Sequence, residues 1–493
     1  MKTSCIKFLS AVLAVAMLLG SMLSLASCAE TNEEPKDTVV TKGEAGTVAE
    51  EEETKFIAYD SINKEKFGGR EFTILSRDDM KEQYEVEKIT GEILNDLVYE
   101  RNTVVSEDLD IEFVVIDGGP FDQVISKLTQ QVSTQGNDYD MFTGHKVAFM
   151  NCVPGNYLYD LNTIDTMDLT KPYWDQACRQ DLSLLGKNFM MTGDIDPASM
   201  LISACFVFNK ELNEELGKTE PYELVDNGQW TLDTYLTQVK DVSQDLNNDG
   251  VMSYTDDRFS NTIWSLDGGF SMFYGAGAKF VTINDLGEPE LTYNSEHVIN
   301  IYEKLYKAIV TEKAFWLSRD EIGSYGVNYA IFTGGRALYC VITLSKITTM
   351  LADMETDYGI VPVPKYDEAQ PEYLSFVNGA SPFAMVAQNA KDVDFIGSVL
   401  EAMAAYNYDN ITPKMFEIVT KLQSARDPDS SRMVDYIIRN RIYDFGYFIE
   451  LEITNVVMNA ITQQKETIAS DLKSKDRAGK NALKNLMKKF NEK

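Results

Sequence analysis

The sequence predicts an α/β protein with more than one domain, and two observations lead to this fold class. Between residues 70 and 142, segments of strand composition alternate with segments of helical periodicity, an order that favours sheets with helices on their faces. The chain has 493 residues, which is too long for a single hydrophobic core. At least two domains are therefore expected.

The strands and helices predicted between residues 70 and 142 alternate regularly. Strands are predicted at 71–75, 111–116 and 139–142, and apolar residues recur at helical spacing over 93–109 and 121–132. Because ligands of such sheets bind beyond the carboxyl ends of the strands, the segments after the first and third strands form a candidate site.

The rest of the chain continues the α/β pattern and ends in helices. Strands are predicted at 188–192, 204–209, 337–342 and 358–364. Helices are predicted at 230–245, with Thr231 as the N-cap, and at 298–310, and mainly helix is expected from 392 onward. Residues 262–280 are expected to lack regular structure, because they combine several aromatic residues with many glycines and serines.

The N-terminus has the organisation of an export signal. A basic start is followed by an apolar run and by the small residues that precede Cys28. Residues 1–27 are predicted to be a signal peptide, and Leu25-Ala26-Ser27-Cys28 resembles the lipobox of bacterial lipoproteins, which implies lipidation of Cys28. An ordinary secretory signal or an uncleaved anchor remains the alternative. Residues 28–55 are acidic and poor in large apolar residues, so we expect a disordered tether.

Charge and cysteine content narrow the possible partners. With 45 basic and 77 acidic residues the formal net charge is −32, so nucleic acid is excluded as a partner, and no polybasic patch for anionic lipid is expected. No second apolar run approaches the length of a membrane span. Beyond the N-terminus, widely spaced cysteines allow either up to two disulfides or buried free thiols: Cys152, Cys178, Cys205 and Cys340.

The segment 245–257 matches the spacing of an EF-hand calcium loop. It has oxygen-bearing side chains at positions 1, 3, 5, 9 and 12, glycine at position 6 and a backbone carbonyl at position 7. Calcium in a structural role is expected here, and a metal-free Asx-Gly turn is the alternative because position 12 is an aspartate. The predicted ligands are Asp245, Asn247, Asp249, Val251, Ser253 and Asp256, with Asp257 as an assisting or replacing group.

Several short motifs appear in the order found in a known family. The chain from residue 69 to 493 resembles family 1 of the extracellular solute-binding proteins of ABC importers, the group that contains maltose-binding protein. The motifs that carry this resemblance are Tyr139-Asp140-Met141-Phe142, the segments 155–161 and 229–235, Phe332-Thr333-Gly334-Gly335-Arg336-Ala337-Leu338 and Gly359-Ile360-Val361-Pro362-Val363-Pro364-Lys365.

The resemblance implies a two-lobed, type II periplasmic-binding-protein-like fold without catalytic chemistry. One lobe would contain 56–163 with 326–376, and the other 164–325 with 377–493. It also implies a monomeric receptor that captures a carbohydrate, such as an oligosaccharide, and delivers it to ABC permease subunits. Its location would be the extracellular face of the cell membrane, through the lipid on Cys28.

A sugar site needs flat aromatic rings for the C–H faces and fixed polar groups for the hydroxyls. Trp264 is the main candidate for stacking, and a tryptophan of the core is the alternative. Arg77, Asp78 and Asp79 follow the first strand, where solvated loop charges are the alternative, and His145 is equally explained as a structural partner. The predicted ligand-binding residues are Trp264, Arg77, Asp78, His145, Phe149, Asp267 and Phe270.

Two other functions stay open. One is an anchored extracellular hydrolase such as a glycosidase, although the sequence has no H-E-x-x-H or G-x-S-x-G motif and only two histidines. The other is a receptor of the same fold for a non-sugar solute such as a peptide, because fold alone does not decide the ligand.

Overall fold

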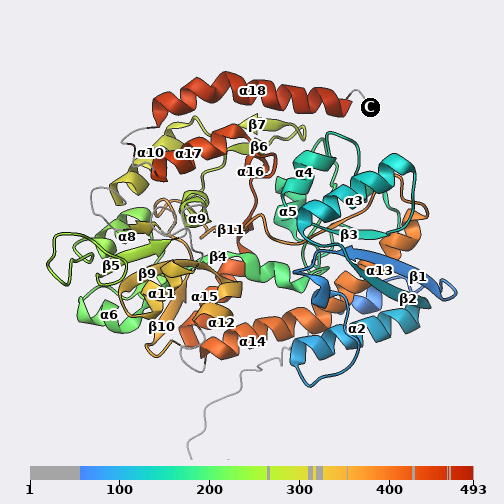
Figure 1. Cartoon of the computed structure of the whole chain (residues 1–493), viewed down its shortest axis with the longest axis horizontal. Coiled ribbons are helices and arrows are strands. Elements are labelled where there is room, and N and C mark those ends of the chain that lie inside the picture. Colours follow the sequence, from blue (N-terminus) through green and yellow to red (C-terminus); the bar gives the residue numbers. More distant parts are fainter. Residues whose placement is uncertain are drawn as a thin grey trace, which may run out of the picture. The chain divides into compact units, whose positions relative to one another are not determined.

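The computed structural model describes residues 56–491, except 264–266, 309–314, 318–325, 352–353, 425–427, 463–464 and 466–467. The predicted signal peptide 1–27, Cys28 and the tether 28–55 lie outside the described residues and stay predictions. The chain from Phe56 onward forms a single compact unit built around two main sheets. Figure 1 shows both sheets with their helices.

The first sheet has four strands and confirms the regular pattern expected near the N-terminus. The strand β1 (Arg70–Ser76) is parallel to both of its neighbours in the sheet, with Phe72 opposite Phe113 and Ile74 opposite Met141. The fourth strand comes from a distant part of the chain and runs antiparallel. In spatial order the strands are β12 (Phe383–Met385), β3 (Met141–Gly144), β1 (Arg70–Ser76) and β2 (Ile111–Asp117).

The helices of the first sheet follow from their apolar periodicity. In α2 (Ile93–Leu109) the residues at helical spacing, among them Val98 and Val105, are buried. The carboxylate of Glu92 caps this helix by accepting the N–H of Asn95 at 2.7 Å. The second helix, α3 (Phe121–Thr134), likewise buries its apolar face, and α13 (Val393–Tyr406) packs against α2.

The second sheet has five strands and mixed direction. The strand β9 is antiparallel to β4 and parallel to β5, so it lies at the centre of the sheet. Six of its seven residues are buried, as expected for a strand covered on both faces. In spatial order the strands are β10 (Tyr358–Val361), β4 (Ala204–Asn209), β9 (Ala337–Thr343), β5 (Phe259–Ile263) and β8 (Phe315–Leu317).

These pairings correct the predicted division of the chain. Residues 326–376 were expected in the first lobe, but β9 and β10 pair with β4 in the second sheet. Conversely, β12 lies within 377–493, a segment expected in the second lobe, and pairs with β3 in the first sheet. The apolar pattern identifies a strand, whereas its sheet depends on partners far away in the sequence.

Three connections join the parts of the chain that carry the two sheets. The first contains the 3-10 helix η4 (Pro197–Ile202), which leads into β4. The second runs from β11 (Ser375–Phe376) to β12. The third is a continuous helical path through α13, the π-helix η6 (Asn407–Ile411) and α14 (Thr412–Ser424).

Three expectations for the middle of the chain need correction. No strand forms at 188–192, where Met191 makes only an isolated antiparallel bridge with Ala384. The helix expected at 230–245 is α8 (Leu232–Val239), which begins at the predicted N-cap Thr231 but ends six residues early. Part of the segment 262–280 is a helix, α9 (Asp267–Gly275), in spite of its glycines. Phe273 and Tyr274 of α9 are fully buried, so tertiary packing outweighs weak helix propensity here.

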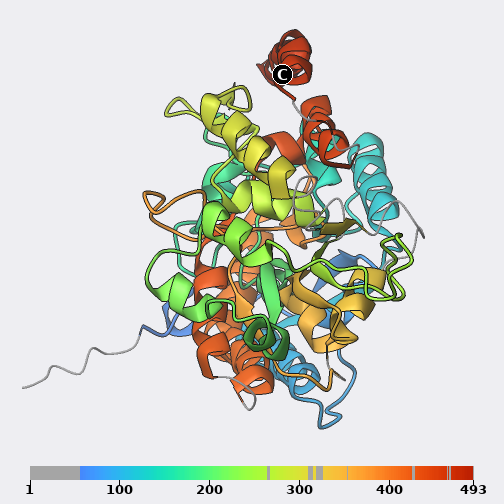
Figure 2. The ribbon, with the colours of Figure 1, turned by 90° about the vertical axis from the view of Figure 1, so that its left-hand side faces the viewer.

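The remaining elements connect and cover the two sheets. They are η1 (Tyr59–Ser61), η2 (Lys81–Gln83), α4 (Val147–Cys152), η3 (Leu161–Thr163), α5 (Gln176–Asp181), α6 (Lys210–Glu215), α7 (Pro221–Asp226), β6 (Val281–Ile283), β7 (Pro289–Leu291), α10 (Glu296–Tyr306), α11 (Val327–Thr333), α12 (Leu344–Met350), α15 (Pro428–Arg439), β13 (Arg441–Ile442), α16 (Phe445–Phe448), α17 (Glu452–Thr462) and α18 (Ala469–Asn491). Figures 1 and 2 both place α18 at one edge of this unit.

The four cysteines of the described part are buried free thiols, which decides between the two alternatives left open by their spacing. Burial raises the pKa of the Cys152 and Cys340 thiols to about 12, so they stay protonated. Within the described residues, none of the helices has the length and apolar character needed to span a membrane.

Candidate functional site

A cavity of about 630 Å³ lies where the carboxyl ends of parallel strands from both sheets meet. This volume is in the range of about 300–1,000 Å³ that is typical of small-molecule sites. Its lining residues are Asp79, Met80, Gln83, Ala198, Leu201, Ile202, Ala204, Gly268, Ser271, Tyr329, Val341, Ile342, Thr343, Ser345, Lys346, Asn378 and Ala380.

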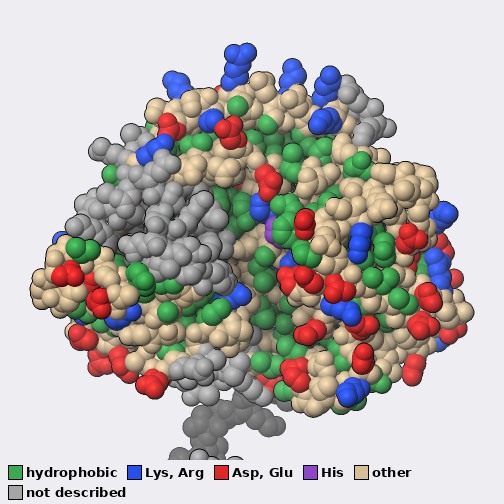
Figure 3. Space-filling model, viewed as in Figure 1, with side chains coloured by type: hydrophobic (Ala, Val, Ile, Leu, Met, Phe, Trp, Pro, Cys, Tyr) green, Lys and Arg blue, Asp and Glu red, His purple; other side chains and the backbone are tan. Residues whose placement is uncertain are grey.

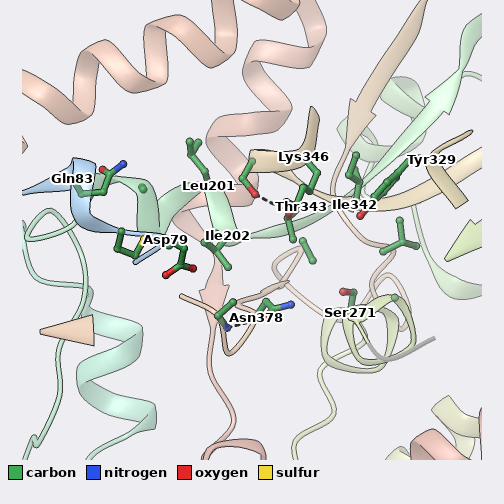
Figure 4. A pocket seen from close by; sticks show the side chains of 17 residues that line it. Asp79, Gln83, Leu201, Ile202, Ser271, Tyr329, Ile342, Thr343, Lys346 and Asn378 are labelled. Atoms are coloured by element: carbon green, nitrogen blue, oxygen red, sulfur yellow. Dashed lines mark hydrogen bonds between the residues drawn. The ribbon is translucent and has the colours of Figure 1, made fainter. Parts of the chain in front are cut away.

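Two walls of the cavity come from loops or helices that follow strands. The segment 79–83 follows β1 of the first sheet, while α9 follows β5 and α12 follows β9 of the second. Figure 4 shows Asp79 and Gln83 on one side of the cavity and Lys346 and Tyr329 on the other. A ligand between them would therefore touch residues associated with both sheets.

Arg77, a predicted ligand residue, does not line the cavity but binds two residues that do, Asp79 and Ala380. Its side chain is only 3% exposed, and it forms a two-pronged ion pair with Asp79, with Nε–Oδ1 at 2.9 Å and Nη2–Oδ2 at 2.6 Å. Its Nη1 donates to the carbonyl oxygens of Gly144 at 2.8 Å and Ala380 at 3.0 Å. The guanidinium therefore joins the end of β3 to the connection before β12, and it positions Asp79.

Asp79 presents a carboxylate to the cavity. Its side chain is 54% exposed although it is paired with Arg77, so its oxygens remain accessible to a ligand. The neighbouring Asp78, which was the predicted ligand, is exposed but does not line the cavity. Its Oδ1 accepts the N–H of Asp79 at 2.9 Å and thereby shapes the loop.

The connections between the sheets contribute a mixed surface to the cavity. Leu201 and Ile202 of η4 supply apolar side chains, and Asn378 adds an amide from the second connection. The Oδ1 of Asn378 accepts the N–H of Ala380 at 2.8 Å, which fixes the orientation of this amide. These residues lie in the segments that link the two sheets, so a ligand bound to them would contact the connections directly.

The wall from the second sheet is rich in hydroxyl groups. Thr343 at the end of β9 and Ser345 in α12 have their hydroxyl oxygens 3.0 Å apart. Lys346 adds a positive charge, and Ser271 and Tyr329 complete the polar lining. This wall offers both donors and acceptors.

A buried carboxyl group lies just before η4. Asp196 accepts a hydrogen bond from the hydroxyl of Tyr84 at 2.8 Å. Burial raises the pKa of Asp196 to about 6, even though that hydrogen bond and the charges of Arg77 and Arg101 act in the opposite direction. Arg101 is fully buried, and burial lowers its pKa to about 10.

Besides Arg77 and Asp78, three predicted ligand residues do not line the cavity. His145 is half-buried and stacks on Phe121 with ring centroids 4.3 Å apart, and burial lowers its pKa to about 4. Phe149 is 0% exposed and packs edge-on against Phe445. Phe270, a residue of α9, is buried in an aromatic cluster and contacts the ring of Tyr447. In this structure Phe149 and Phe270 belong to the core, because helix packing turns them inward.

Two further predicted residues, Trp264 and Asp267, are close in sequence to residues that line the cavity. Trp264 is outside the described residues, and so is the side chain of Asp267, the first residue of α9. Gly268 and Ser271 of the same helix line the cavity. The role predicted for Trp264 stays a prediction.

Sequence reasoning missed most of the residues that line the cavity. Gln83, Ser271, Tyr329 and Asn378 carry no recognisable motif. Thr343 to Lys346 directly follow a predicted strand, so the rule that ligands bind at carboxyl ends would have found this segment had it been applied there.

The predicted calcium loop is closed by its own hydrogen bonds. The backbone N–H groups of Leu246 and Ser253 donate to the two carboxylate oxygens of Asp257 at 2.8 and 2.6 Å. Asp245 accepts from the N–H groups of Asn248 and Gly250 at 2.7 and 2.8 Å. Across the described residues, no group of three or more His, Cys, Asp or Glu side chains is placed to hold a metal ion. Calcium binding stays a prediction that rests on spacing.

The fold of residues 56–491 is similar to that of several proteins of known structure. A cyclo/maltodextrin-binding protein solved with maltotetraose aligns at a TM-score of 0.55 and 14% identity, covering 87% of this chain and 98% of that one. A cyclic alpha-maltosyl-1,6-maltose binding protein from Arthrobacter globiformis aligns at 0.53 and 15%, covering 85% and 100%. A family 1 extracellular solute-binding protein from Bifidobacterium longum subsp. infantis aligns at 0.53 and 16%, covering 87% and 100%.

The fold is that of the extracellular solute-binding proteins. No protein-family model matches the sequence, and no curated protein matches it significantly. The likeness therefore lies in the arrangement of the sheets and helices, which confirms the predicted α/β fold class. At this level of identity it does not transfer the ligands of those proteins to this chain.

Proposed function

We propose that the protein is an extracellular substrate-binding protein of an ABC importer, which captures a carbohydrate such as an oligosaccharide. The single observation that carries this proposal is the cavity of about 630 Å³ lined by residues from both sheets and from the connections between them. In a solute-binding fold, a ligand in this position bridges elements that move relative to one another when the domains close.

The lining chemistry favours a sugar over an apolar ligand. Asp79, Gln83 and Asn378 carry oxygen-bearing groups, and Thr343 and Ser345 add hydroxyls, so donors and acceptors surround the cavity. Apolar C–H faces of a sugar would contact Leu201 and Ile202, and Trp264 would supply the stacking ring.

Anchoring and delivery complete the proposal. Cleavage before Cys28 and lipidation of its sulfur would hold a monomeric receptor at the extracellular face of the cell membrane. There it would hand its ligand to ABC permease subunits. A tethered receptor has a high effective concentration near its permease without any gain in affinity. The apolar run before Cys28 and the acidic segment after it support this part of the proposal.

No turnover is proposed, and the alternatives make different predictions. An anchored glycosidase would release products from an oligosaccharide, whereas a receptor would bind it unchanged. A peptide receptor of the same fold would be stabilised by peptides and not by saccharides. Incubation with gluco-, manno-, xylo- and galacto-oligosaccharides, followed by chromatography and by thermal melting, separates the three. If peptides alone raise the melting temperature, the sugar proposal fails.

A pair of neighbouring aspartates provides a matched test of the site. We expect Asp79→Asn to weaken binding of the stabilising saccharide by about 1–3 kcal/mol, because a charge-assisted hydrogen bond is lost. Asp78→Asn removes the same charge one residue away, outside the cavity, and should leave affinity unchanged. Trp264→Ala should cost more than about 1 kcal/mol if the ring stacks on the ligand. Isothermal titration calorimetry measures all three; equal effects of the two aspartate variants would argue against this cavity.

A further inference from the structure

The C-terminal helix α18 is attached to the body of the protein through one face only. Leu472, Leu483 and Leu486 are buried, and α18 packs against α17 and β7. A Cβ at Gly479 would approach Leu291 of β7 to 3.2 Å, which shows how closely the helix lies on that strand. The leucines of the apolar face are therefore packed within the protein.

A different face of the same helix carries a row of basic side chains. Lys473, Arg477, Lys480, Lys484 and Lys488 are spaced by three or four residues, so they lie on one side of the helix. All five are exposed, and the row extends over about 22 Å at 1.5 Å per residue. We call these five residues the basic stripe. Figure 3 shows Lys and Arg side chains along this edge of the molecule.

Most of this charge is not neutralised within the protein. In the described part of the chain, Lys480 pairs with Asp476 at 2.7 Å, while Lys473, Arg477 and Lys484 have no ion-pair partner. Residues 469–491 contain seven basic and two acidic residues, in a chain that has 45 basic and 77 acidic residues in total. The expectation that the chain has no polybasic patch is therefore wrong for α18. Composition averages over the chain, whereas the helix gathers these residues on one face.

We propose that the basic stripe docks on the surface of an anionic phospholipid membrane. The charge is complementary to acidic headgroups, while the remainder of the chain is acidic overall and is repelled by them, so electrostatics turn this edge toward such a surface. Because the apolar face of α18 is already packed, the helix cannot insert as a free amphipathic helix does. The contact is peripheral, electrostatic and sensitive to salt.

Such docking would act as a second membrane signal. It would add a salt-sensitive electrostatic contact to the lipid anchor expected at Cys28. With the lipid on the N-terminal Cys28 and the stripe on the C-terminal helix, the protein would have two points of contact at opposite ends of its sequence. The inference does not depend on which solute the cavity binds.

The test is co-sedimentation with vesicles, using the chain from residue 28 onward with Cys28→Ser so that no lipid contributes. One set of vesicles is pure phosphatidylcholine, and the other is an equimolar mixture with phosphatidylglycerol. The stripe variant carries glutamine at all five positions of the basic stripe. A control variant replaces five exposed lysines elsewhere by glutamine: Lys66, Lys88, Lys240, Lys391 and Lys414.

We expect the unmodified protein to bind the phosphatidylglycerol vesicles only and to be released by raised salt. Each Lys or Arg near an anionic surface contributes about 1 kcal/mol, so the stripe variant should lose on the order of hundredfold or more in partition coefficient. The control variant should bind as well as the unmodified protein. Thermal melting verifies that both variants are folded. If the unmodified protein does not co-sediment with anionic vesicles at low salt, or if both variants lose binding equally, the proposal is overturned.

Discussion

Replacing Arg77 by methionine tests the central claim about the site. This claim is that the Arg77 guanidinium positions Asp79 and fixes the backbone at Gly144 and Ala380. Methionine keeps much of the alkyl volume but removes every hydrogen bond of the guanidinium. The carbonyl oxygens of Gly144 and Ala380 would lose their charged donor, and Asp79 would lose the partner that orients it. Both stability and ligand affinity should therefore fall.

The magnitude follows from the contacts. Hydrogen bonds to a charged group contribute about 1.5–3 kcal/mol each, so the two carbonyl bonds account for about 3–6 kcal/mol. The ion pair adds about 0–1 kcal/mol, because the Asp79 side chain is 54% exposed and solvent screens the interaction. We expect the free energy of unfolding to drop by about 3–7 kcal/mol, a large share of the total stability of about 5–15 kcal/mol that is typical of proteins.

Denaturation in guanidinium chloride, followed by tryptophan fluorescence, measures this loss. Arg439→Met is the matched control, since Arg439 is 76% exposed and only pairs with Asp435 one helical turn away. Its loss should stay below about 0.5 kcal/mol. If Arg77→Met costs less than about 1 kcal/mol, the carbonyl contacts do not support the site and the reasoning fails.

Three further predictions concern the core, a buried acid and the Asp245 loop. Phe270→Ala should destabilise the protein by about 3–5 kcal/mol in denaturant titrations. The saccharide affinity of the folded fraction should stay unchanged, and weaker binding would show that Phe270 belongs to the ligand site. Burial raises the pKa of Glu401 to about 7, so the folded state holds this proton more tightly than the unfolded chain. Its contribution to stability is complete below about pH 4.5 and is lost as the pH rises through about 7. Melting temperatures measured between these limits should fall with pH less steeply in Glu401→Gln, and an unchanged slope would rule out Glu401 as the cause. Calcium should raise the melting temperature relative to a chelator, whereas equal values would leave the loop as a hydrogen-bonded turn.

Local patterns determined most of the individual elements. The strands β1 and β2 and the helices α2 and α3 lie within one or two residues of their predicted ranges, because apolar periodicity reports directly on which face is buried. Thr231 was predicted as an N-cap and acts as one, since its hydroxyl oxygen accepts the N–H of Thr234 at 3.2 Å. These features depend on neighbours within a few residues of each other in the chain.

Tertiary structure decided which strands share a sheet and which side chains reach the cavity. The pattern of β9 marks a buried strand but contains nothing that selects β4 and β5 as its partners. Phe149 and Arg77 both follow strands of the first sheet, yet one packs into the core and the other supports Asp79. The basic stripe needed the helix to form before separated lysines became one surface. For the sheets and the core, the deciding contacts join residues far apart in the sequence, which periodicity and composition do not identify. The basic stripe depends instead on the helical spacing of nearby residues, and the tertiary structure decided only that this face of α18 stays exposed.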